Sequence, residues 1–361
     1  MKKAIINLLF ILFLIPITTQ AKVWRVNSSI SADFGTLDAA MVSYANNDTL
    51  YLEPSATNYT ISNDILNSNT RLVTIIGNGY NLTDNSGLQA NTLSSIISAT
   101  NSTGLFIRSN IKFVGITFAS QVLLDFNPGG NNRYENVAFE SCLFKNSIQT
   151  ISSPQTFINN LHFTKNYFLN SVVIRFSTSF FQSITNFVFE NNIATNDFVL
   201  DGDGLNTSVK DKLIRNNVFL GSAFCNLAYL ANNIFATPIS GTSTFNLSIF
   251  NNNLIAGNTD LSSLNFVSFN NNLINVDPSN VFQNFSLSTK DKSFQLKAGS
   301  PAIGAGIPNG STPVDCGAFG GPNPYKLSGI PAIPSIYELQ APSSVRPGND
   351  MQINLKSRSN N

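Results

Sequence analysis

The sequence predicts an all-β protein built as a parallel β-helix, and three observations lead to this fold class. A six-residue phrase returns through the middle of the chain every 16 to 26 residues, and it reads as an apolar residue, two variable residues, usually Asn, then two mostly apolar residues. Such a period is typical of a solenoid. The phrase keeps one order in every copy, whereas a β-sandwich would need antiparallel hairpins. Helices are disfavoured because Phe and Asn are weak helix formers and turn residues interrupt every stretch.

The fourth position of the phrase marks each coil. The marker residues are Ile116, Cys142, Asn166, Asn192, Asn217, Asn233, Asn253 and Asn272. Asn tolerates the left-handed backbone region and bonds its own backbone, so we expect the marker to form a tight bend between short strands. At a strand spacing of about 4.8 Å, the six Asn residues would make a structural ladder. The apolar columns three residues before and two after the marker would become internal stacks.

The ends of the repeat region are expected to differ from the coils, because a solenoid must cap its core. Residues 34–45 have apolar spacing suited to one short amphipathic helix, with Thr36 as its N-cap. Strands are expected at 49–52 and 71–76. After Asn272 the period dissolves, and the Gly-rich stretches 300–306 and 315–321 are interpreted as a closing turn.

The chain therefore divides into three parts. Residues 1–21 are expected to be a signal peptide, since Lys2 and Lys3 precede an apolar run of 14 residues and a small-residue cleavage site. A membrane anchor is the alternative, but a span needs about 20 apolar residues. Residues 22–321 form the β-helix with its N-terminal cap. Residues 322–361 form a Pro-rich segment with a terminal hairpin over 336–339 and 351–355.

Composition limits the partners. Only 11% of the residues are charged, and removal of residues 1–21 leaves 19 basic and 20 acidic residues. Nucleic acid binding needs a concentrated basic surface, so it is not expected. The spacing of Cys142, Cys225 and Cys316 matches no zinc pattern, and we expect no metal site. Cys142 and Cys225 are interpreted as small buried hydrophobic residues.

These phrases together resemble the secreted right-handed parallel β-helix proteins of the pectin-lyase-like superfamily. Residues 34–40, 47–52 and 74–77 are similar to its N-terminal cap and first coils, and residues 300–306 with 315–320 are similar to the ending of many such proteins from Bacteroidetes. The resemblance implies a right-handed solenoid with a short N-terminal capping helix and a small C-terminal β cap. It implies no activity, because the superfamily includes lyases, hydrolases, adhesins and proteins of no assigned role.

Catalytic signatures are sparse. Hydrolysis by this fold needs converging carboxylates, and the polygalacturonase-like Gly-His-Gly phrase is missing, since the single histidine, His162, has no glycine neighbour. Lyases of this fold use calcium held by carboxylates, with an Arg or Lys as the base. Asp201 and Asp203 are the candidate calcium ligands, and Lys210 and Arg215 are the candidate bases. A Gly-rich turn and a solvated loop are the alternatives, and no cofactor is expected unless the protein is a lyase.

Alignment of the coils indicates one outer column. Nine residues after the marker, Arg175 and Asp201 fall one coil apart on the same outward face. We expect them to form a cross-coil ion pair beside Val173, Val199 and Phe224, with Phe224 as a stacking platform for sugar. Coils between Cys142 and Asn217 are the longest, so a groove is expected within about residues 145–215.

Two functions remain open from the sequence. The first is an exported, non-catalytic β-helix that binds glycan or another surface, or forms part of a cell-surface assembly. The alternative is a polysaccharide lyase acting on uronate polymers. A polysaccharide or a cell-surface protein is the expected partner. The expected location is the cell exterior or outer-membrane surface, with the periplasm as a further option.

Overall fold

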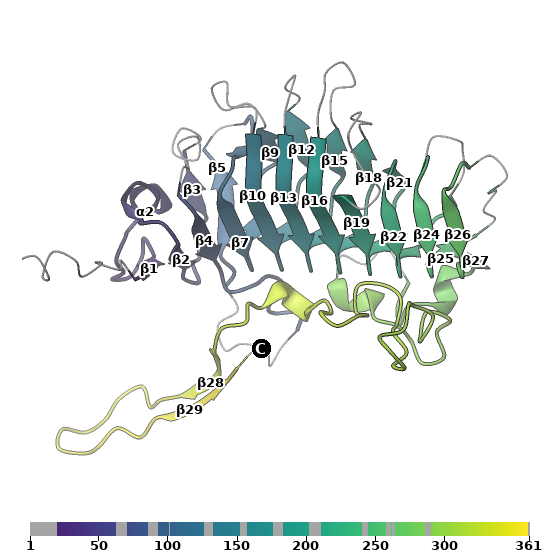
Figure 1. The fold of residues 1–361 in the computed structure, drawn as a ribbon. Coiled ribbons are helices and arrows are strands. Elements are labelled where there is room, and N and C mark those ends of the chain that lie inside the picture. The colour runs from purple at the N-terminus through teal and green to yellow at the C-terminus, as the bar shows by residue number, and fades with distance from the viewer. Residues whose placement is uncertain are drawn as a thin grey trace, which may run out of the picture.

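The computed structural model describes residues 20–62, 71–85, 93–100, 102–125, 133–151, 157–175, 183–201, 211–239, 245–257, 261, 264–285 and 290–359. The predicted parallel β-helix is confirmed, because three all-parallel sheets stack coil upon coil along one axis (Figure 1). The predicted signal peptide lies almost wholly outside the described residues. No helix in the described ranges combines the length and hydropathy of a membrane span.

The strands of each sheet follow one another in coil order. The eleven-stranded sheet contains β1 (Val23–Val26), β2 (Asp48–Leu52), β4 (Val73–Ile76), β7 (Ile111–Val114), β10 (Arg133–Glu140), β13 (Phe157–Thr164), β16 (Ser183–Glu190), β19 (Lys212–Arg215), β22 (Tyr229–Ala231), β24 (Ile249–Asn251) and β26 (Ser268–Asn270). The ten-stranded sheet contains β3 (Tyr59–Ile61), β5 (Ile96–Ala99), β8 (Thr117–Phe118), β11 (Leu143–Phe144), β14 (Tyr167–Phe168), β17 (Ile193–Ala194), β20 (Val218–Phe219), β23 (Ile234–Phe235), β25 (Leu254–Ala256) and β27 (Leu273–Val276). The six-stranded sheet contains β6 (Leu105–Ile107), β9 (Val122–Asp125), β12 (Ile148–Ile151), β15 (Val172–Arg175), β18 (Phe198–Asp201) and β21 (Ala223–Cys225).

The core of the coil stack includes both predicted apolar columns. Phe139 stacks on Phe163 with ring centroids 5.2 Å apart, and Phe144 stacks on Phe168 at 4.6 Å. Cys142 and Cys225 are buried, as predicted. Burial raises the pKa of the Cys142 thiol to about 12, so the thiol stays protonated at neutral pH.

The predicted Asn ladder is confirmed, but the bend lies one residue earlier than expected. The marker Asn residues turn into the core and are almost fully buried up to Asn253. Each main-chain N–H and each amide nitrogen donates to the amide oxygen of the next marker, as from Asn192 to Asn217 at 2.8 and 3.1 Å. The preceding residue takes the left-handed conformation, with φ between 53° and 63°, in Gly115, Ser141, Lys165, Asn191, Asn216, Asn232, Asn252 and Asn271. The side chain of each marker Asn points into the core, where its amide joins the ladder. The residue before it therefore takes the left-handed conformation and forms the bend.

The first coil is capped by α2 (Leu37–Ser43). Thr36 is its N-cap, as predicted, because the hydroxyl accepts a hydrogen bond from the Ala39 N–H at 3.2 Å. Leu37, Ala40 and Met41 are buried against the first coils. The Asp48 carboxylate at the start of β2 accepts hydrogen bonds from Lys22 N, Trp24 Nε1 and Ala45 N at 2.7–2.8 Å. The cap is thus both packed and hydrogen-bonded to the coil beneath it.

After β27 the chain leaves the coil stack and lies along the outer face of the ten-stranded sheet (Figure 1). We call residues 277–285 and 290–334 the strap; it includes the 3₁₀ turns η2 (Pro278–Asn280), η3 (Asp291–Phe294) and η4 (Leu327–Gly329). Strap side chains such as Phe294, Cys316 and Tyr325 form a second core with outward side chains of the sheet. Those outward side chains are Leu143, Tyr167, Ile193, Val218, Ile234 and Leu254. Packing continues past residue 321, since Tyr325 and Ile330 are also buried.

A buried polar cluster joins the strap to the early coils. Tyr80 and Tyr325 share a hydrogen bond between their hydroxyls, and Tyr325 donates to Asp291 at 3.1 Å. The Ser328 N–H donates to the same carboxylate at 2.7 Å. Burial raises the pKa values of Tyr80 and Tyr325 well above their ordinary range. The cluster therefore stays in its hydrogen-bonded, neutral-phenol form at physiological pH.

The chain ends in an antiparallel hairpin of β28 (Ser335–Gln340) and β29 (Asn354–Arg358). In Figure 1 the hairpin stands away from the coil stack, below its N-terminal half, and does not lie over the last coil. Its apolar side chains Ile336, Leu339, Met351, Ile353 and Leu355 are exposed.

Candidate functional site

The outer face of the eleven-stranded sheet is a long sheet face that the strap leaves uncovered (Figure 1). One outward row crosses the face from Lys112 through Ala138, His162, Val188, Leu213 and Tyr229 to Ile249, and each of these side chains is partly exposed. The ring of Tyr229 is held at the surface by a 3.4 Å contact from Asn251 Nδ2 to its hydroxyl. Four of these seven side chains are aliphatic, and the other three are Lys112, His162 and Tyr229.

A second Asn ladder runs beside this row, and the sequence analysis missed it. We call Asn110, Asn136, Asn160 and Asn186 the outer ladder. From Asn136 onward, each member donates from its Nδ2 to the Oδ1 of the preceding member, at 2.9, 3.0 and 2.6 Å in coil order. All four have positive φ, between 54° and 64°. The signal was available, since these Asn residues recur at steps of 26, 24 and 26 residues, the steps between the equivalent markers.

Unlike the inner ladder, the outer ladder faces solvent. Asn136 and Asn160 are partly exposed and Asn186 is exposed. A side-chain amide has two N–H donors and a carbonyl oxygen with two lone pairs. In Asn160 the ladder uses one donor and one lone pair. The remaining donor and lone pair can therefore bind a hydroxyl-rich ligand without breaking the ladder.

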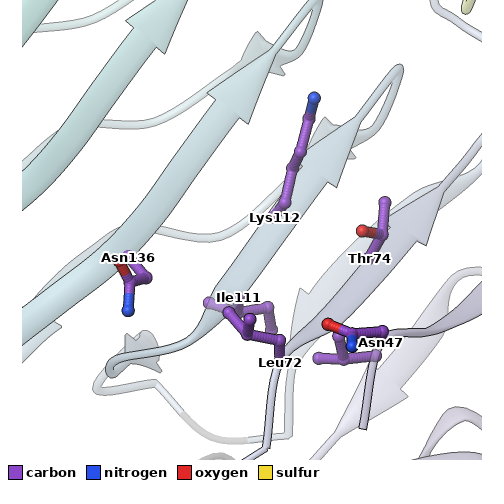
Figure 2. Close-up of a pocket in the computed structure, with 7 residues that line it drawn as sticks. Asn47, Leu72, Thr74, Ile111, Lys112 and Asn136 are labelled. Atoms are coloured by element: carbon purple, nitrogen blue, oxygen red, sulfur yellow. The ribbon is translucent and has the colours of Figure 1, made fainter.

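A pocket lies at the start of the outer ladder. Figure 2 shows Asn47, Thr74, Lys112 and Asn136 around it, on the outer faces of β4, β7 and β10 and the turns that precede β2 and β4. Its volume is about 300 Å³, and Leu72, Val73 and Ile111 also line it. Ligand pockets of this size bind through an apolar floor and a few placed polar groups. Because Asn136 belongs to both pocket and ladder, the two form one continuous surface.

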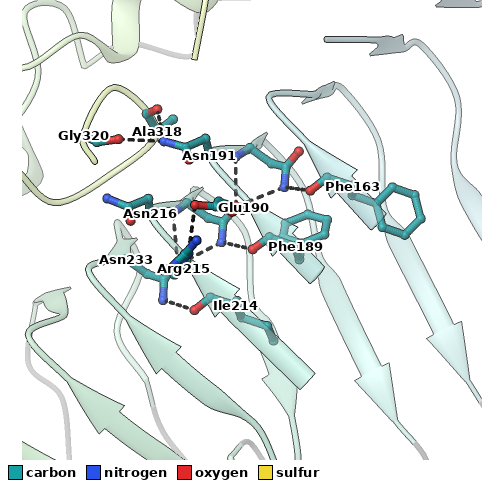
Figure 3. Close-up of polar contacts among 12 residues, drawn as sticks. Phe163, Phe189, Glu190, Asn191, Ile214, Arg215, Asn216, Asn233, Ala318 and Gly320 are labelled. Atoms are coloured by element: carbon teal, nitrogen blue, oxygen red, sulfur yellow. Dashed lines mark hydrogen bonds and ion pairs between the residues drawn. The ribbon is translucent and has the colours of Figure 1, made fainter. Parts of the chain in front are cut away.

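Two ion-pair groups border this surface where the eleven-stranded sheet bends toward the ten-stranded one. Glu140 pairs with Lys112 at 2.7 Å and lies 3.9 Å from Lys165. Burial lowers the pKa of Lys165 below its ordinary value, although Glu140 opposes that shift. Glu190 accepts from Arg215 Nε at 2.8 Å (Figure 3). These carboxylates are neutralised by neighbouring coils, which leaves the face with little net charge.

The residues predicted as a binding site fall on two faces. Arg175 and Asp201 are register partners on β15 and β18, and Phe224 follows Val199 in the same register on β21. The predicted shared face of the six-stranded sheet is thus confirmed for these three residues. No salt bridge between Arg175 and Asp201 is among those described, and the predicted ion pair stays a prediction. Arg215 lies on the eleven-stranded sheet, apart from the other three.

Asp203 and Lys210, the other candidate ligand and base of the lyase hypothesis, lie outside the described residues. So do parts of the predicted groove within 145–215, which therefore stays a prediction. In the described part of the chain no group of three or more His, Cys, Asp or Glu residues is arranged to hold a metal ion. His162 lies in the outward row, and its enclosed Nε2 has no hydrogen-bond partner among the described residues.

The residue before each marker, which forms the bend, has a second role that the sequence did not reveal. In several coils its side chain binds the strap. Asn191 donates from Nδ2 to the carbonyl oxygens of Ala318 and Gly320, both at 2.8 Å (Figure 3). Asn252 Nδ2 donates to Ala305 O at 3.0 Å, and Asn232 Oδ1 accepts from Ile307 N at 2.8 Å. In these three Asn-Asn pairs, the first Asn binds the strap and the second belongs to the inner ladder.

Comparison with known proteins gives no family assignment. No protein-family model matches the chain, and no curated protein matches it with significance.

Proposed function

We propose that the protein is an exported, non-catalytic β-helix that binds a neutral polysaccharide lengthwise along the outer face of the eleven-stranded sheet. The observation that carries the proposal is the outer ladder, which presents amides in line along the solenoid axis. The rungs lie on successive coils, about 4.8 Å apart. A polymer that repeats hydroxyl groups along its length suits such a surface better than a compact ligand.

The chemistry around the ladder supports a neutral sugar polymer. Amides and sugar hydroxyls both donate and accept hydrogen bonds, and the neighbouring aliphatic row with Tyr229 offers an apolar surface for the faces of sugar rings. Thr185 extends the polar strip, since its hydroxyl bonds Asn159 Oδ1 at 3.0 Å. A polyanion would lack a net positive field here, because the cations Lys112 and Arg215 are already paired with glutamates.

Export and ancestry are parts of the same proposal. The N-terminal sequence supports secretion, which would place this surface outside the inner membrane, where polysaccharides occur. Residues 34–40, 47–52 and 74–77 resemble the N-terminal cap and first coils of secreted pectin-lyase-like proteins, which supports a shared origin. Residues 300–306 and 315–320 resemble the ending of many such proteins from Bacteroidetes. The parallel β-helix is compatible with that origin, and the proposed activity rests on the outer ladder alone.

The test measures binding of the purified protein to neutral and uronate polysaccharides by affinity electrophoresis and calorimetry. The decisive variant is Asn136→Gly/Asn160→Gly. Glycine keeps the left-handed backbone while it removes both amides. Loss of one hydrogen bond per rung, each contributing about 1 kcal/mol, should weaken binding at least about tenfold.

Asn275→Gly is the matched control, because Asn275 has a similar φ of 59° and lies in the last coil, away from the outer ladder. This variant should bind like the wild type. The absence of binding to every neutral polymer would refute the proposal, and so would equal binding by the ladder variant. An ultraviolet absorbance rise on pectate or alginate with calcium would instead identify a lyase.

A further inference from the structure

The last coil of the solenoid is open. β26 and β27 are the terminal strands of the two long sheets, so each has one edge without a neighbouring strand among the described residues. The strap leaves this end at Asp277 and packs against the side of the stack. Figure 1 shows the two strands at the end of the stack opposite α2.

Apolar side chains of the last coil are exposed to solvent at this end. Leu273 and Ile274 are 40% and 42% exposed, whereas Leu254 and Ile255, the residues at the same positions one coil earlier, are at most 1% exposed. Phe266 and Phe269 are only partly buried, and Val267 is 58% exposed. The cross-section of the core therefore reaches solvent at this end.

The inner ladder also stops there with unused groups. Asn272 accepts from Asn253 and donates its amide to Phe250 O at 3.1 Å. In every earlier rung from Asn166 onward, the main-chain N–H donates to the next Asn, and Asn272 has no such acceptor among the described residues. The end thus presents unpaired hydrogen-bonding groups as well as apolar side chains.

This edge lacks the features that keep sheet edges apart. Natural edge strands usually carry Lys, Pro or inward charges that prevent pairing. Residues 261–276 contain no Lys, Arg, Asp, Glu or Pro. A charged edge would repel a second copy of itself, whereas a neutral edge with amides and apolar side chains is complementary to its own copy.

The opposite end cannot serve as the partner surface. α2 covers the first coil with its buried residues Leu37, Ala40 and Met41. A head-to-tail contact would place the open end against this helix and leave the strand edges unpaired. Two open ends meeting about a two-fold axis pair both edges at once and close the assembly.

We propose that the protein forms a two-fold symmetric dimer through its last coil, with β26 antiparallel to β26 of a second copy. The two core cross-sections meet face to face, and Leu273 and Ile274 leave water. The dimer is an elongated rod with a capping helix at each tip. The outer ladders of the two copies lie far from the interface.

The test measures the mass of the purified full-length protein after export, by sedimentation equilibrium over a range of concentrations, and its maximum dimension by small-angle scattering. A dimer about twice as long as the monomer is expected. Leu273→Lys/Ile274→Lys places like charges in the interface and should raise the dimer dissociation constant about a hundredfold or more. Val267→Lys tests the same surface at a more exposed position.

Two matched controls place an exposed Lys elsewhere. Val42→Lys alters the outer side of α2, where Val42 is 65% exposed, and Leu339→Lys alters the hairpin, where Leu339 is 56% exposed. Both should remain dimeric, and circular dichroism should show all variants folded. A monomeric wild type would overturn the proposal, and so would a control variant that is monomeric while the Leu273→Lys/Ile274→Lys variant stays dimeric. A monomeric variant should still bind polysaccharide like the wild type, so failure of the dimer proposal and failure of the proposed function are distinguishable.

Discussion

At the residue scale, two adjacent positions of the Asn-rich phrase have different structural roles. The marker turns inward and joins the inner ladder, while the residue before it takes positive φ and faces the strap. The period alone could not separate two neighbouring Asn residues. The weaker copies hold the distinguishing signal, because Gly115 occupies the bend position and the apolar residues Ile116 and Cys142 occupy the inward one. Gly115 is also required by space, since a Cβ there would lie 2.6 Å from Pro331 Cγ.

A first prediction concerns the inner ladder. Asn217→Ala removes the donor to Phe189 O and the acceptor of Asn192 N, and it leaves both groups buried and unpaired. Unpaired buried groups cost about 1–3 kcal/mol each, so the free energy of unfolding should fall by about 3 kcal/mol in urea titration. Asn58→Ala, at an exposed position, should change it by less than about 0.5 kcal/mol. Equal effects of the two variants would contradict a structural ladder.

A second prediction concerns Asp48 under the N-terminal cap. Burial alone would raise its pKa, but hydrogen bonds from Ala45, Lys22 and Trp24 outweigh burial and hold the pKa below the ordinary 3.8. A carboxyl with a lowered folded pKa stabilises the protein above its unfolded pKa, and this contribution is lost as the pH falls through the folded pKa. Asp48→Asn should therefore be less stable than the wild type at pH 7.

The difference between Asp48→Asn and the wild type should shrink as the pH falls below about 4. Urea midpoints measured from pH 7 down to pH 2.5 test this. Asp350→Asn, which alters an exposed carboxyl between β28 and β29, should follow the wild type throughout. A difference between Asp48→Asn and the wild type that is constant with pH would show that the lost hydrogen-bond geometry, and not the charge, matters.

At the element scale, the coils were predictable and the strap was not. Coils follow from a period that any single sequence shows. The strap depends on contacts such as Asn191 with Ala318 and Tyr80 with Tyr325, which are far apart in sequence and follow no period. The sequence stretch that was interpreted as a closing turn does turn, but it packs against the side of the stack. Short two-residue strands such as β14 and β17 alternate too briefly to reveal that their outward residues are buried as well.

A third prediction uses the cysteines to detect opening of the strap. Cys316 is buried in the strap, and burial raises the pKa of its thiol to about 12, whereas Cys225 lies inside the coils. Asn191→Gly removes two hydrogen bonds to the strap and keeps the left-handed backbone. Alkylation of Cys316 in native buffer, followed by mass spectrometry, should become about tenfold faster, and alkylation of Cys225 should be unchanged.

Asn186→Gly is the control for this experiment, because Asn186 has the same φ of 54° but belongs to the outer ladder. Its Cys316 should react at the wild-type rate. If Cys316 and Cys225 accelerated together in Asn191→Gly, the strap would open only with global unfolding. That result would contradict a separate, weaker attachment of the strap.

At the scale of the whole molecule, the fold exposes its faces unequally. The strap covers the ten-stranded sheet, and the eleven-stranded sheet keeps an amide-lined outer face. The sequence predicted the solenoid and showed few charged residues, but it could not say which face would be covered. Arg175 and Asp201 were placed correctly relative to each other because strand register follows the period. Arg175 and Asp201 lie on the six-stranded sheet and Arg215 lies on the eleven-stranded sheet. A single column of marker residues could not predict this separation, because it does not show where each coil bends from one sheet to the next.

A fourth prediction separates the strap from the hairpin by truncation. Removal of the residues after 334 takes away only the exposed hairpin, so the thermal midpoint should change by no more than a few degrees. Removal of the residues after 276 uncovers the six outward side chains of the ten-stranded sheet, whose burial contributes about 10 kcal/mol in total. This loss is comparable with the entire stability of a typical domain, so the shorter chain should aggregate or remain unfolded. Circular dichroism and sedimentation measure both outcomes. A folded, monomeric chain ending at 276 would mean that the coil stack is stable without the strap, and that the second core contributes little to the fold.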